Sequence, residues 1–519
     1  MQVAGRRAEK ALFLLLWLGG KPDGGLAFRI TPPPHRPCTT VHVSRASSAA
    51  AATAGTSQAH GFEVSPEAIG SSRQLSKSVV VARGKARLFW EGNPLVYGRA
   101  ISRVEGDPVA GDLVDVVDSS GKFIAWGVYN PDSMYRVRIL AREGEASAKV
   151  RDVQAVVKER LLIARDARRA IGIPNADTNT YRLVNGEGDR LSGLVVDVFA
   201  GVVGVSSSAV WVETYRREIE AALEQVFGDD STEVIWRRSD GRLQQDGWKG
   251  NSSVVTAVAT GGVVNTQATE DSTLSLDDSE DSSGEEAEGD GEKVQERRLR
   301  SDVSSTVVRE LGLEYVVRPR SGQKTGFYCD QRESRAAVRE LSAGKTVLDM
   351  FCYSGGFSLN AAAGGALRVI AVDSSQAALE EAEINAARNN LDGLTEFVKD
   401  DALKFMRAAR NNGEKYDMVI VDPPKLAPNK KALPRATSRY KRLNAAALEL
   451  VAPGGILVTF TCSAAMTQGG GFVGVVQSAA MAAGRTIALL KTAGPAADHV
   501  TNPCYPEGAY LTGAFFYAV

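Results

Sequence analysis

From Lys345 to the C-terminus, apolar strand-like runs alternate with helical segments, and this alternation constrains the fold more than any other feature. Four runs are predicted to be strands, at 346–351, 368–372, 416–421 and 456–461. Helices are expected between them, including 375–390 and 437–451. Mostly apolar strands separated by helices are typical of a parallel sheet covered on both faces. We therefore predict a doubly wound α/β domain with its ligand site at the carboxyl ends of the strands.

Two smaller regions precede this domain. Between Lys85 and Leu140, five short segments have strand-like alternation, at 86–90, 95–101, 112–117, 123–129 and 135–140. Residues 118–121, Asp-Ser-Ser-Gly, are typical of a hairpin turn, so we predict a small all-β module. Helical periodicity follows at 149–172 and 212–226, with strand-like runs at 191–198 and 202–206. This mixture predicts an α+β region.

Charge is distributed unevenly along the chain. The formal net charge is −1, yet residues 270–292 contain eleven Asp/Glu and no Lys/Arg. Residues 250–300 are rich in Ser, Thr, Gly, Asp and Glu, so we predict a disordered acidic insertion that acts as a solvated spacer. An acidic run can also imitate RNA in a basic cleft. The remainder of the folded part is mildly basic, which permits a polyanionic partner.

The first 62 residues have the composition of a targeting leader. Three basic residues precede an apolar run at 11–18 that is too short to span a membrane, and residues 24–62 contain no acidic residue. We predict a two-part leader over 1–62 that directs the protein to an organelle, with a plastid favoured over a mitochondrion. A secretory signal peptide is the alternative. Five scattered cysteines without a C-x-x-C pair disfavour it, because secreted proteins usually form disulfides.

Histidine is too scarce for most histidine-based mechanisms. Of the four histidines, three lie in the predicted leader, which leaves His499. A Ser-His-Asp triad or a histidine-rich metal site would therefore depend on that single residue, and we predict no metal.

The first chemical motif is a strand that ends in a double-glycine turn. Residues 347–357 have the sequence VLDMFCYSGGF. Glycines let the backbone approach a ligand that Cβ atoms would block, but the spacing is not the G-x-G-x-x-G of dinucleotide sites. The alternative is that this turn is a structural connection between a strand and a helix and binds no ligand. We predict S-adenosylmethionine binding by Asp349, Phe351, Tyr353, Ser354, Gly355 and Gly356.

Acidic residues at the ends of later strands extend this predicted cofactor site. Asp373 lies where a Rossmann-type acidic residue contacts ribose hydroxyls, and Asp401 is placed to accept from the adenine amino group. We assign Ala402, Asp422 and Thr325 to the same site.

Two further motifs follow the next strands. At residues 422–425, Asp-Pro-Pro-Lys, two prolines stiffen a loop that could hold a planar base, with Asp422 facing its ring nitrogen and amino edge. Cys462 ends the following strand, where a thiolate could add to carbon 6 of a cytosine and activate carbon 5. A lone cysteine is usually a small buried hydrophobe, and Cys352 competes for the nucleophile role. We predict Cys462 and Asp422 as the catalytic residues.

These residues resemble a known family, the bacterial large-subunit ribosomal RNA cytosine-5 methyltransferase I group. The similarity runs from about residue 86 to the end, interrupted by the insertion. Besides the turn at Asp349, the matching stretches are GEGDRLSGL at 186–194, RSD at 238–240, GQKTGFYCDQR at 322–332, DPPK at 422–425, TCS at 461–463, DHV at 498–500 and YPEGAYL at 505–511.

The resemblance implies three domains and a mechanism with one cysteine. It implies a PUA-like RNA-binding domain at 80–145, a central α+β domain at 149–320 that contains the insertion, and a class I, Rossmann-like methyltransferase domain at 321–519. It also implies Cys462 as the nucleophile. Other RNA cytosine-5 methyltransferases carry a second cysteine where this chain has Lys425, so another base must remove the carbon-5 proton. Relatives usually have HPWVF where residues 93–97 are NPLVY.

Three functions remain open on the sequence alone. The first is formation of 5-methylcytosine in organellar large-subunit rRNA, with RNA as partner. The second is methylation of an exocyclic amine or a guanine nitrogen, which needs no thiol. The third is a non-enzymatic RNA-binding assembly factor. We predict no stable membrane association, and we leave a homodimer open beside a monomer.

Overall fold

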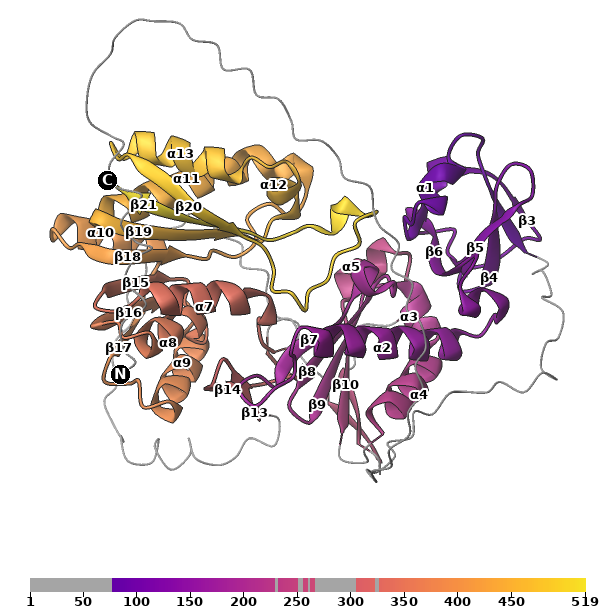
Figure 1. The fold of residues 1–519 in the computed structure, drawn as a ribbon, viewed down its shortest axis with the longest axis horizontal. Helices are drawn as coiled ribbons and strands as arrows, with labels where there is room; N and C mark the ends of the chain where they lie inside the picture. Colours follow the sequence, from indigo (N-terminus) through magenta and orange to yellow (C-terminus); the bar gives the residue numbers. More distant parts are fainter. Residues whose placement is uncertain (1–76, 229–231, 251–254, 260–261, 267–304, 323–325) are drawn as a thin grey trace, which may run out of the picture. The chain divides into compact units, whose positions relative to one another are not determined.

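The structure, a computed structural model, describes residues 77–228, 232–250, 255–259, 262–266, 305–322 and 326–519 (Figure 1). The predicted leader and Thr325 lie outside these residues. No helix in the described part of the chain is both long enough and apolar enough to cross a membrane.

The N-terminal region is a six-stranded sheet. Its strand order is β2-β6-β5-β4-β1-β3. The strands are β1 (Ser78–Val81), β2 (Leu95–Tyr97), β3 (Ile101–Glu105), β4 (Leu113–Val117), β5 (Phe123–Tyr129) and β6 (Tyr135–Arg142). The predicted hairpin turn joins β4 to β5, where the Asp118 carboxylate accepts from the amides of Ser120 and Lys122. The prediction of a small β module is confirmed, although it missed β1.

The segment at 86–90 corrects one predicted strand, because it forms the short helix α1 (Ala86–Trp90). Phe89 is its only fully buried side chain, whereas Leu88 and Trp90 are exposed. A strand would have placed Leu88 and Trp90 on one face with the polar Arg87 and buried Phe89 on the other. The helix instead directs Phe89 alone into the core.

The central region is an α+β unit whose sheet has the order β12-β11-β10-β9-β8-β7. Four of its strands are β7 (Thr180–Asn185), β8 (Leu194–Phe199), β9 (Val202–Ser207) and β10 (Glu233–Arg238). Its helices are α2 (Val153–Ala170), α3 (Val210–Thr214), α4 (Arg216–Phe227) and α5 (Asp240–Gln245). The single helix predicted at 212–226 is two helices that meet at Tyr215. The Tyr215 hydroxyl donates to the Gly111 carbonyl at 2.8 Å, which ties this bend to the N-terminal region.

Two strands correct the prediction that residues 250–300 as a whole are a disordered insertion. Strands β11 (Val255–Ala259) and β12 (Gly262–Thr266) pair with each other, and β11 pairs with β10. Their β-branched residues favour strands. The prediction gave more weight to the Ser, Thr, Asp and Glu content of the whole segment, and it therefore missed this local preference. The acidic run at 270–292 lies outside the described residues.

A two-stranded hairpin connects the central region to the C-terminal domain. It consists of β13 (Thr306–Glu310) and β14 (Leu313–Val317). Its buried Val308 and Tyr315 belong to one apolar cluster with Phe199 of β8 and Leu359 of the C-terminal domain. Both neighbouring regions therefore contribute to the core around this hairpin.

The C-terminal domain is a doubly wound seven-stranded sheet with the order β17-β16-β15-β18-β19-β21-β20. The strands are β15 (Thr346–Met350), β16 (Arg368–Asp373), β17 (Thr395–Lys399), β18 (Tyr416–Val421), β19 (Val451–Thr461), β20 (Ile487–Ala493) and β21 (Thr512–Ala518). The helices are α7 (Arg332–Leu341), α8 (Gly356–Ala363), α9 (Gln376–Arg388), α10 (Ala402–Asn411), α11 (Leu433–Leu450), α12 (Ala464–Gln468) and α13 (Phe472–Ala482). The first five strands in this order are parallel, and β21 runs antiparallel to both its neighbours.

Alternate residues of the central strands supply the cores on the two faces of this sheet. Leu348 and Val419 pack with the helices α10, α11 and α13, while Val347 and Ile420 pack with α7 and α8. Figure 1 shows these two groups of helices on opposite sides of the sheet. The strand order reverses between β15 and β18, and ligands of such sheets bind at this switch point. The predicted α/β class and its site location follow from this arrangement.

Candidate active site

The turn after β15 has a strained backbone. Phe351 and Tyr353 have φ angles of 65° and 51°, and Gly355 has 84°. Non-glycine residues rarely adopt such angles, and they persist at sites where surrounding structure holds them. Here the amide of Tyr353 donates to Asp373 at 3.0 Å, and the amide of Gly355 donates to the Cys352 carbonyl at 2.9 Å. The turn is thus held open as a backbone cradle at the N-terminus of α8.

Asp349 supports this turn from inside the domain. Its side chain is fully buried, and its Oδ2 accepts from the Ser358 hydroxyl at 2.5 Å. Burial raises its pKa to about 7, against the opposing hydrogen bond from Ser358. Its Oδ1 has no hydrogen-bond partner within the described part of the chain. A buried acceptor of this kind, next to the strained turn after β15, fits a ligand that carries a cationic amino group.

The other predicted cofactor residues surround the cradle at different depths. Asp373 ends β16, is partly exposed, and accepts backbone amides on both oxygens, from Tyr353 and from Ser375 at 2.9 Å. Ser354 is buried and Gly356 begins α8. Asp401 is the exposed N-cap of α10 and accepts from the amide of Lys404 at 2.9 Å, while the Ala402 side chain packs into the core. Their contacts with a cofactor stay predictions.

Cys462 lies at the carboxyl end of β19 and is partly exposed. Its Sγ is 4.0 Å from the carbonyl oxygen of Pro423, in the predicted base-holding loop. Burial lowers the pKa of Lys425, the charge of Arg242 lowers it further, and the Cys462 thiolate opposes both. The Lys425 ammonium and the Cys462 thiol are therefore close enough to interact electrostatically.

Cys352, the competing candidate, has the environment of a structural cysteine. It is buried in an apolar cluster with Ala371 and Leu379. Burial raises its pKa well above the usual value, and the charges of Asp349 and Asp373 raise it further. A thiol that resists ionisation is a poor nucleophile. The structure therefore favours Cys462 over Cys352.

The segment before α7 brings two side chains to the site, Tyr328 and Gln331, to which the sequence motifs assigned no role. The Gln331 amide donates to Asp422 Oδ2 at 3.1 Å and thereby orients this predicted catalytic carboxylate. Tyr328 packs edge-on against the Tyr353 ring, with centroids 5.3 Å apart. Burial raises the pKa of Tyr328, and the charges of Asp422 and Cys462 are among those that raise it further. The resemblance of residues 322–332 to the family indicated that this segment is important, but only the fold shows which residues it contacts.

His499 is structural in this arrangement. It is buried, and its Nδ1 lies 3.0 Å from Asp498 Oδ1. Asp498 also forms a 2.8 Å ion pair with Arg332 and accepts from the amide of Arg182. In the described residues, no group of three or more His, Cys, Asp or Glu is placed to hold a metal ion.

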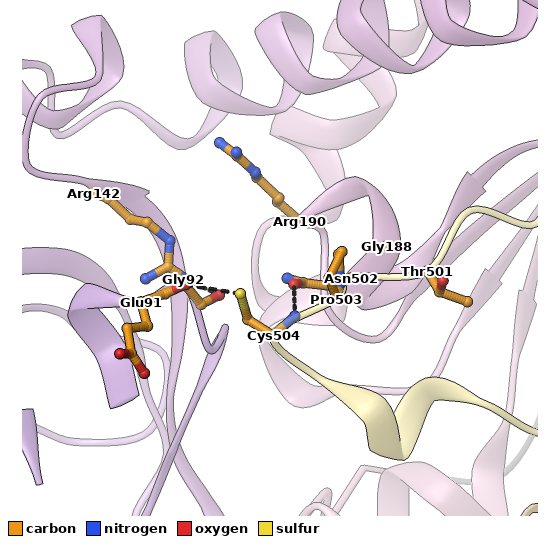
Figure 2. A pocket seen from close by; sticks show the side chains of 9 residues that line it. All are labelled: Glu91, Gly92, Arg142, Gly188, Arg190, Thr501, Asn502, Pro503 and Cys504. Atoms are coloured by element: carbon orange, nitrogen blue, oxygen red, sulfur yellow. Dashed lines mark hydrogen bonds between the residues drawn. The ribbon is translucent and has the colours of Figure 1, made fainter. Parts of the chain in front are cut away.

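A separate pocket of about 310 Å³ lies where the N-terminal and central regions meet the loop between β20 and β21 (Figure 2). It is lined by Glu91, Gly92, Arg142, Gly188, Arg190, Thr501, Asn502, Pro503 and Cys504. Its charged groups are already paired. Arg142 donates to three backbone carbonyls and Arg190 pairs with Glu145, while Glu91 pairs with Arg87. The Cys504 thiol donates to the Glu91 carbonyl, so the pocket joins these segments.

The fold and the site define a class: a class I methyltransferase sheet with a backbone cradle after β15 and a partly exposed thiol after β19. Family models agree, since residues 300–484 match an S-adenosylmethionine-dependent methyltransferase and residues 79–142 a PUA-like domain. The protein is an S-adenosylmethionine-dependent methyltransferase with an N-terminal PUA-like domain.

Curated relatives narrow the class to a family. The chain is 32% identical over 444 residues to a ribosomal RNA large subunit methyltransferase I from Klebsiella pneumoniae, which covers 85% of this chain and 98% of the relative. Proteins of the same name from Aeromonas salmonicida and Escherichia coli are 33% and 32% identical over 441 and 442 residues, with the same coverage. The chain belongs to the ribosomal RNA large subunit methyltransferase I family.

Solved structures agree at the level of the fold. A chain assigned to the SAM-dependent methyltransferases, from Streptococcus mutans, matches with a TM-score of 0.63 and 19% identity, covering 85% of this chain and 99% of that one. A methyltransferase-class chain complexed with SAH, the demethylated cofactor, matches with a TM-score of 0.65 and 20% identity over the same shares.

Proposed function

We propose that this protein methylates carbon 5 of a cytosine in large-subunit ribosomal RNA, with Cys462 as the nucleophile. The observation that carries the proposal is the thiol at the end of β19, partly exposed and 4.0 Å from the carbonyl of Pro423. The relatives named above act on large-subunit ribosomal RNA, and the PUA-like domain supports an RNA substrate.

The residues of the site can perform this chemistry in a defined order. Bound S-adenosylmethionine supplies an electrophilic methyl group. The Cys462 thiolate adds to carbon 6 of the cytosine, which turns carbon 5 into a nucleophile. Carbon 5 would take the methyl group as its bond to the sulfonium sulfur breaks. Transfer of the carbon-5 proton to a base and cleavage of the bond between carbon 6 and the Cys462 sulfur then restore the ring and the thiolate. To Asp422, whose carboxylate accepts from Gln331, we assign the binding of the ring nitrogen and amino edge of the base.

The target base must leave its helix unless it is already unpaired. Swinging a base out of a duplex costs a few kcal/mol. Pro423 and Pro424 stiffen the loop that would receive it, because proline restricts the backbone and donates no hydrogen bond.

The test is bisulfite sequencing of large-subunit rRNA from cells that lack the protein and from cells that carry the wild type, Cys462→Ala or Cys462→Ser. We expect the wild type to create a 5-methylcytosine that both variants fail to create, while cofactor binding persists. Cys504→Ser is the matched control, because this partly exposed thiol lies in the pocket of Figure 2 and should leave methylation intact. Full activity of either Cys462 variant would disprove the proposed chemistry. Mass spectrometry of the nucleoside separates this product from an N-methylated base.

We also propose that residues 1–62 direct the protein to an organelle, most simply a plastid. Their basic, acid-poor composition supports this. Fusion of residues 1–70 to a fluorescent protein tests this targeting, and a diffuse signal would contradict it.

Whether the protein is a homodimer or a monomer is decided by light scattering of the purified protein.

A further inference from the structure

One tyrosine joins the two loops that form the proposed reaction site. Tyr440 lies in α11 and is fully buried. Its hydroxyl accepts from the Thr461 hydroxyl at 2.8 Å and lies 3.0 Å from the Ser463 hydroxyl oxygen. Thr461 and Ser463 flank Cys462, so both neighbours of the thiol are tied to a single phenol.

The same cluster holds the loop that follows β18. The Ser463 hydroxyl oxygen accepts from the amide of Ala427 at 3.0 Å, and the Tyr440 hydroxyl interacts with the backbone of Leu426. The amide of Ser463 also donates to the Thr461 hydroxyl at 3.2 Å. The loop at 422–427 and the turn at 461–463 are therefore fastened to each other through buried hydroxyl groups.

The ring of Tyr440 is held independently of its hydroxyl. It packs edge-on against Phe472, with centroids 5.6 Å apart and planes at 80°. The Asn444 side chain donates to the Tyr440 carbonyl at 2.8 Å. Burial raises the pKa of Tyr440, so its phenol stays protonated at neutral pH and is unsuited to act as a base. A phenylalanine at this position would keep the packing and lose only the hydroxyl contacts.

We infer that Tyr440 is a positioning residue. Its hydroxyl sets the distance between the Cys462 thiol and the base held by the loop at 422–427. The inference rests on the proposed function and adds a residue to it. A displacement of about 1 Å between reacting groups can cost on the order of a hundredfold in rate. The four residues that lie between β18 and Leu426 contain two prolines, so a shift at Leu426 moves the whole loop.

The test compares Tyr440→Phe with Tyr416→Phe. Tyr416 is buried in the same core cluster and its hydroxyl donates to Glu414 at 2.6 Å, at the opposite end of β18 from the reaction site. Both variants remove only the hydroxyl group of a tyrosine in this core cluster and keep its ring. We expect kcat to fall about 10- to 100-fold in Tyr440→Phe, with KM for the RNA and cofactor affinity unchanged, and to stay near wild type in Tyr416→Phe.

A second readout does not depend on RNA. The rate of Cys462 alkylation by iodoacetamide, followed by mass spectrometry against pH, reports the thiolate and its surroundings. We expect this rate to differ from that of the wild type in Tyr440→Phe, because the loosened turn moves the sulfur relative to its surroundings, and to stay near the wild-type rate in Tyr416→Phe. Should Tyr440→Phe not fold, Thr461→Val carries the same test, with Thr461→Ser as the variant that restores a hydroxyl.

The outcomes separate the two proposals. An unchanged kcat and alkylation profile in Tyr440→Phe would overturn the positioning role while Cys462→Ala remained inactive. A loss of activity that merely followed the melting temperature, equal in Tyr416→Phe, would overturn it as well. An active Cys462→Ala would instead overturn the proposed function.

Discussion

At the scale of single residues, the buried carboxyl of Asp349 is the most pH-sensitive feature of the cofactor cradle. Its pKa of about 7 lies well above the value of about 3.9 of an exposed aspartate. Between these values the folded state holds a proton that the unfolded state has lost. The contribution of this group therefore makes the protein less stable as pH rises from about 4 to 7.

Asp349→Asn removes this titration with little change in shape. The amide oxygen can still accept from Ser358, so the turn is retained. We expect the melting temperature of the cofactor-free wild type to fall more between pH 5 and 8 than that of the variant, measured by calorimetry in matched buffers. Parallel curves for the two proteins would contradict the buried, protonated carboxyl.

At the scale of elements, a close backbone approach joins the central region to the loop between β20 and β21. Gly188 lies in a 3-10 turn at Gly186–Asp189 that follows β7. A Cβ there would lie 2.0 Å from the Val500 carbonyl oxygen. The Asn185 side chain donates to the same oxygen at 2.9 Å. The loop thus reaches β7 through contacts that require a glycine.

Gly188→Ala should separate these two segments. Because the clash is with backbone, it cannot be relieved by a side-chain rotation, and we expect a loss of about 1–3 kcal/mol in urea unfolding. Gly201→Ala is the matched control, since a Cβ at that turn of the same region meets no atom of the described residues within 4 Å. The control should stay within about 0.5 kcal/mol of wild type. Equal stabilities of the two variants would refute the close approach.

At the scale of the whole molecule, a buried ionic network joins three parts of the chain. Arg332 of α7 pairs with Asp498, and Arg335 pairs with Glu310 of β13. Arg168 of α2 donates to the Asp498 carbonyl. Burial raises the pKa of Asp498, but the hydrogen bond from His499 and the charge of Arg332 outweigh it and hold the pKa well below its usual range.

Asp498→Asn should leave Arg332 buried without its full countercharge. Removing one partner of a buried pair costs about 3–5 kcal/mol, so we expect a large fall in the urea midpoint. Glu396→Gln is the control, because the pair of Glu396 with Arg368 is exposed and contributes at most about 1 kcal/mol. A small effect of Asp498→Asn would show that the network is not needed to hold the parts together.

Local patterns were sufficient for the elements of the C-terminal domain. The runs at 346–351 and 416–421 are mostly apolar. This pattern is typical of a strand buried on both faces, so the strands and the sheet class could be predicted. The order of the acidic and cysteine motifs after those strands likewise indicated a shared edge. The local pattern was misleading at 86–90, which forms a helix with one fully buried side chain. At 255–259 and 262–266 the composition of the whole segment concealed two paired strands that the local pattern favoured.

Only the tertiary structure decided which residues that are remote in the chain contact each other. Arg168 and Asp498 are 330 positions apart, and Gln331 reaches Asp422 across 91. No local periodicity encodes such partners, because they depend on how whole elements pack. The sequence by itself determined the class of fold, the cofactor and the candidate nucleophile. Packing decided that Cys352 is buried, that Cys462 is accessible, and that Tyr440 fastens the loops around it.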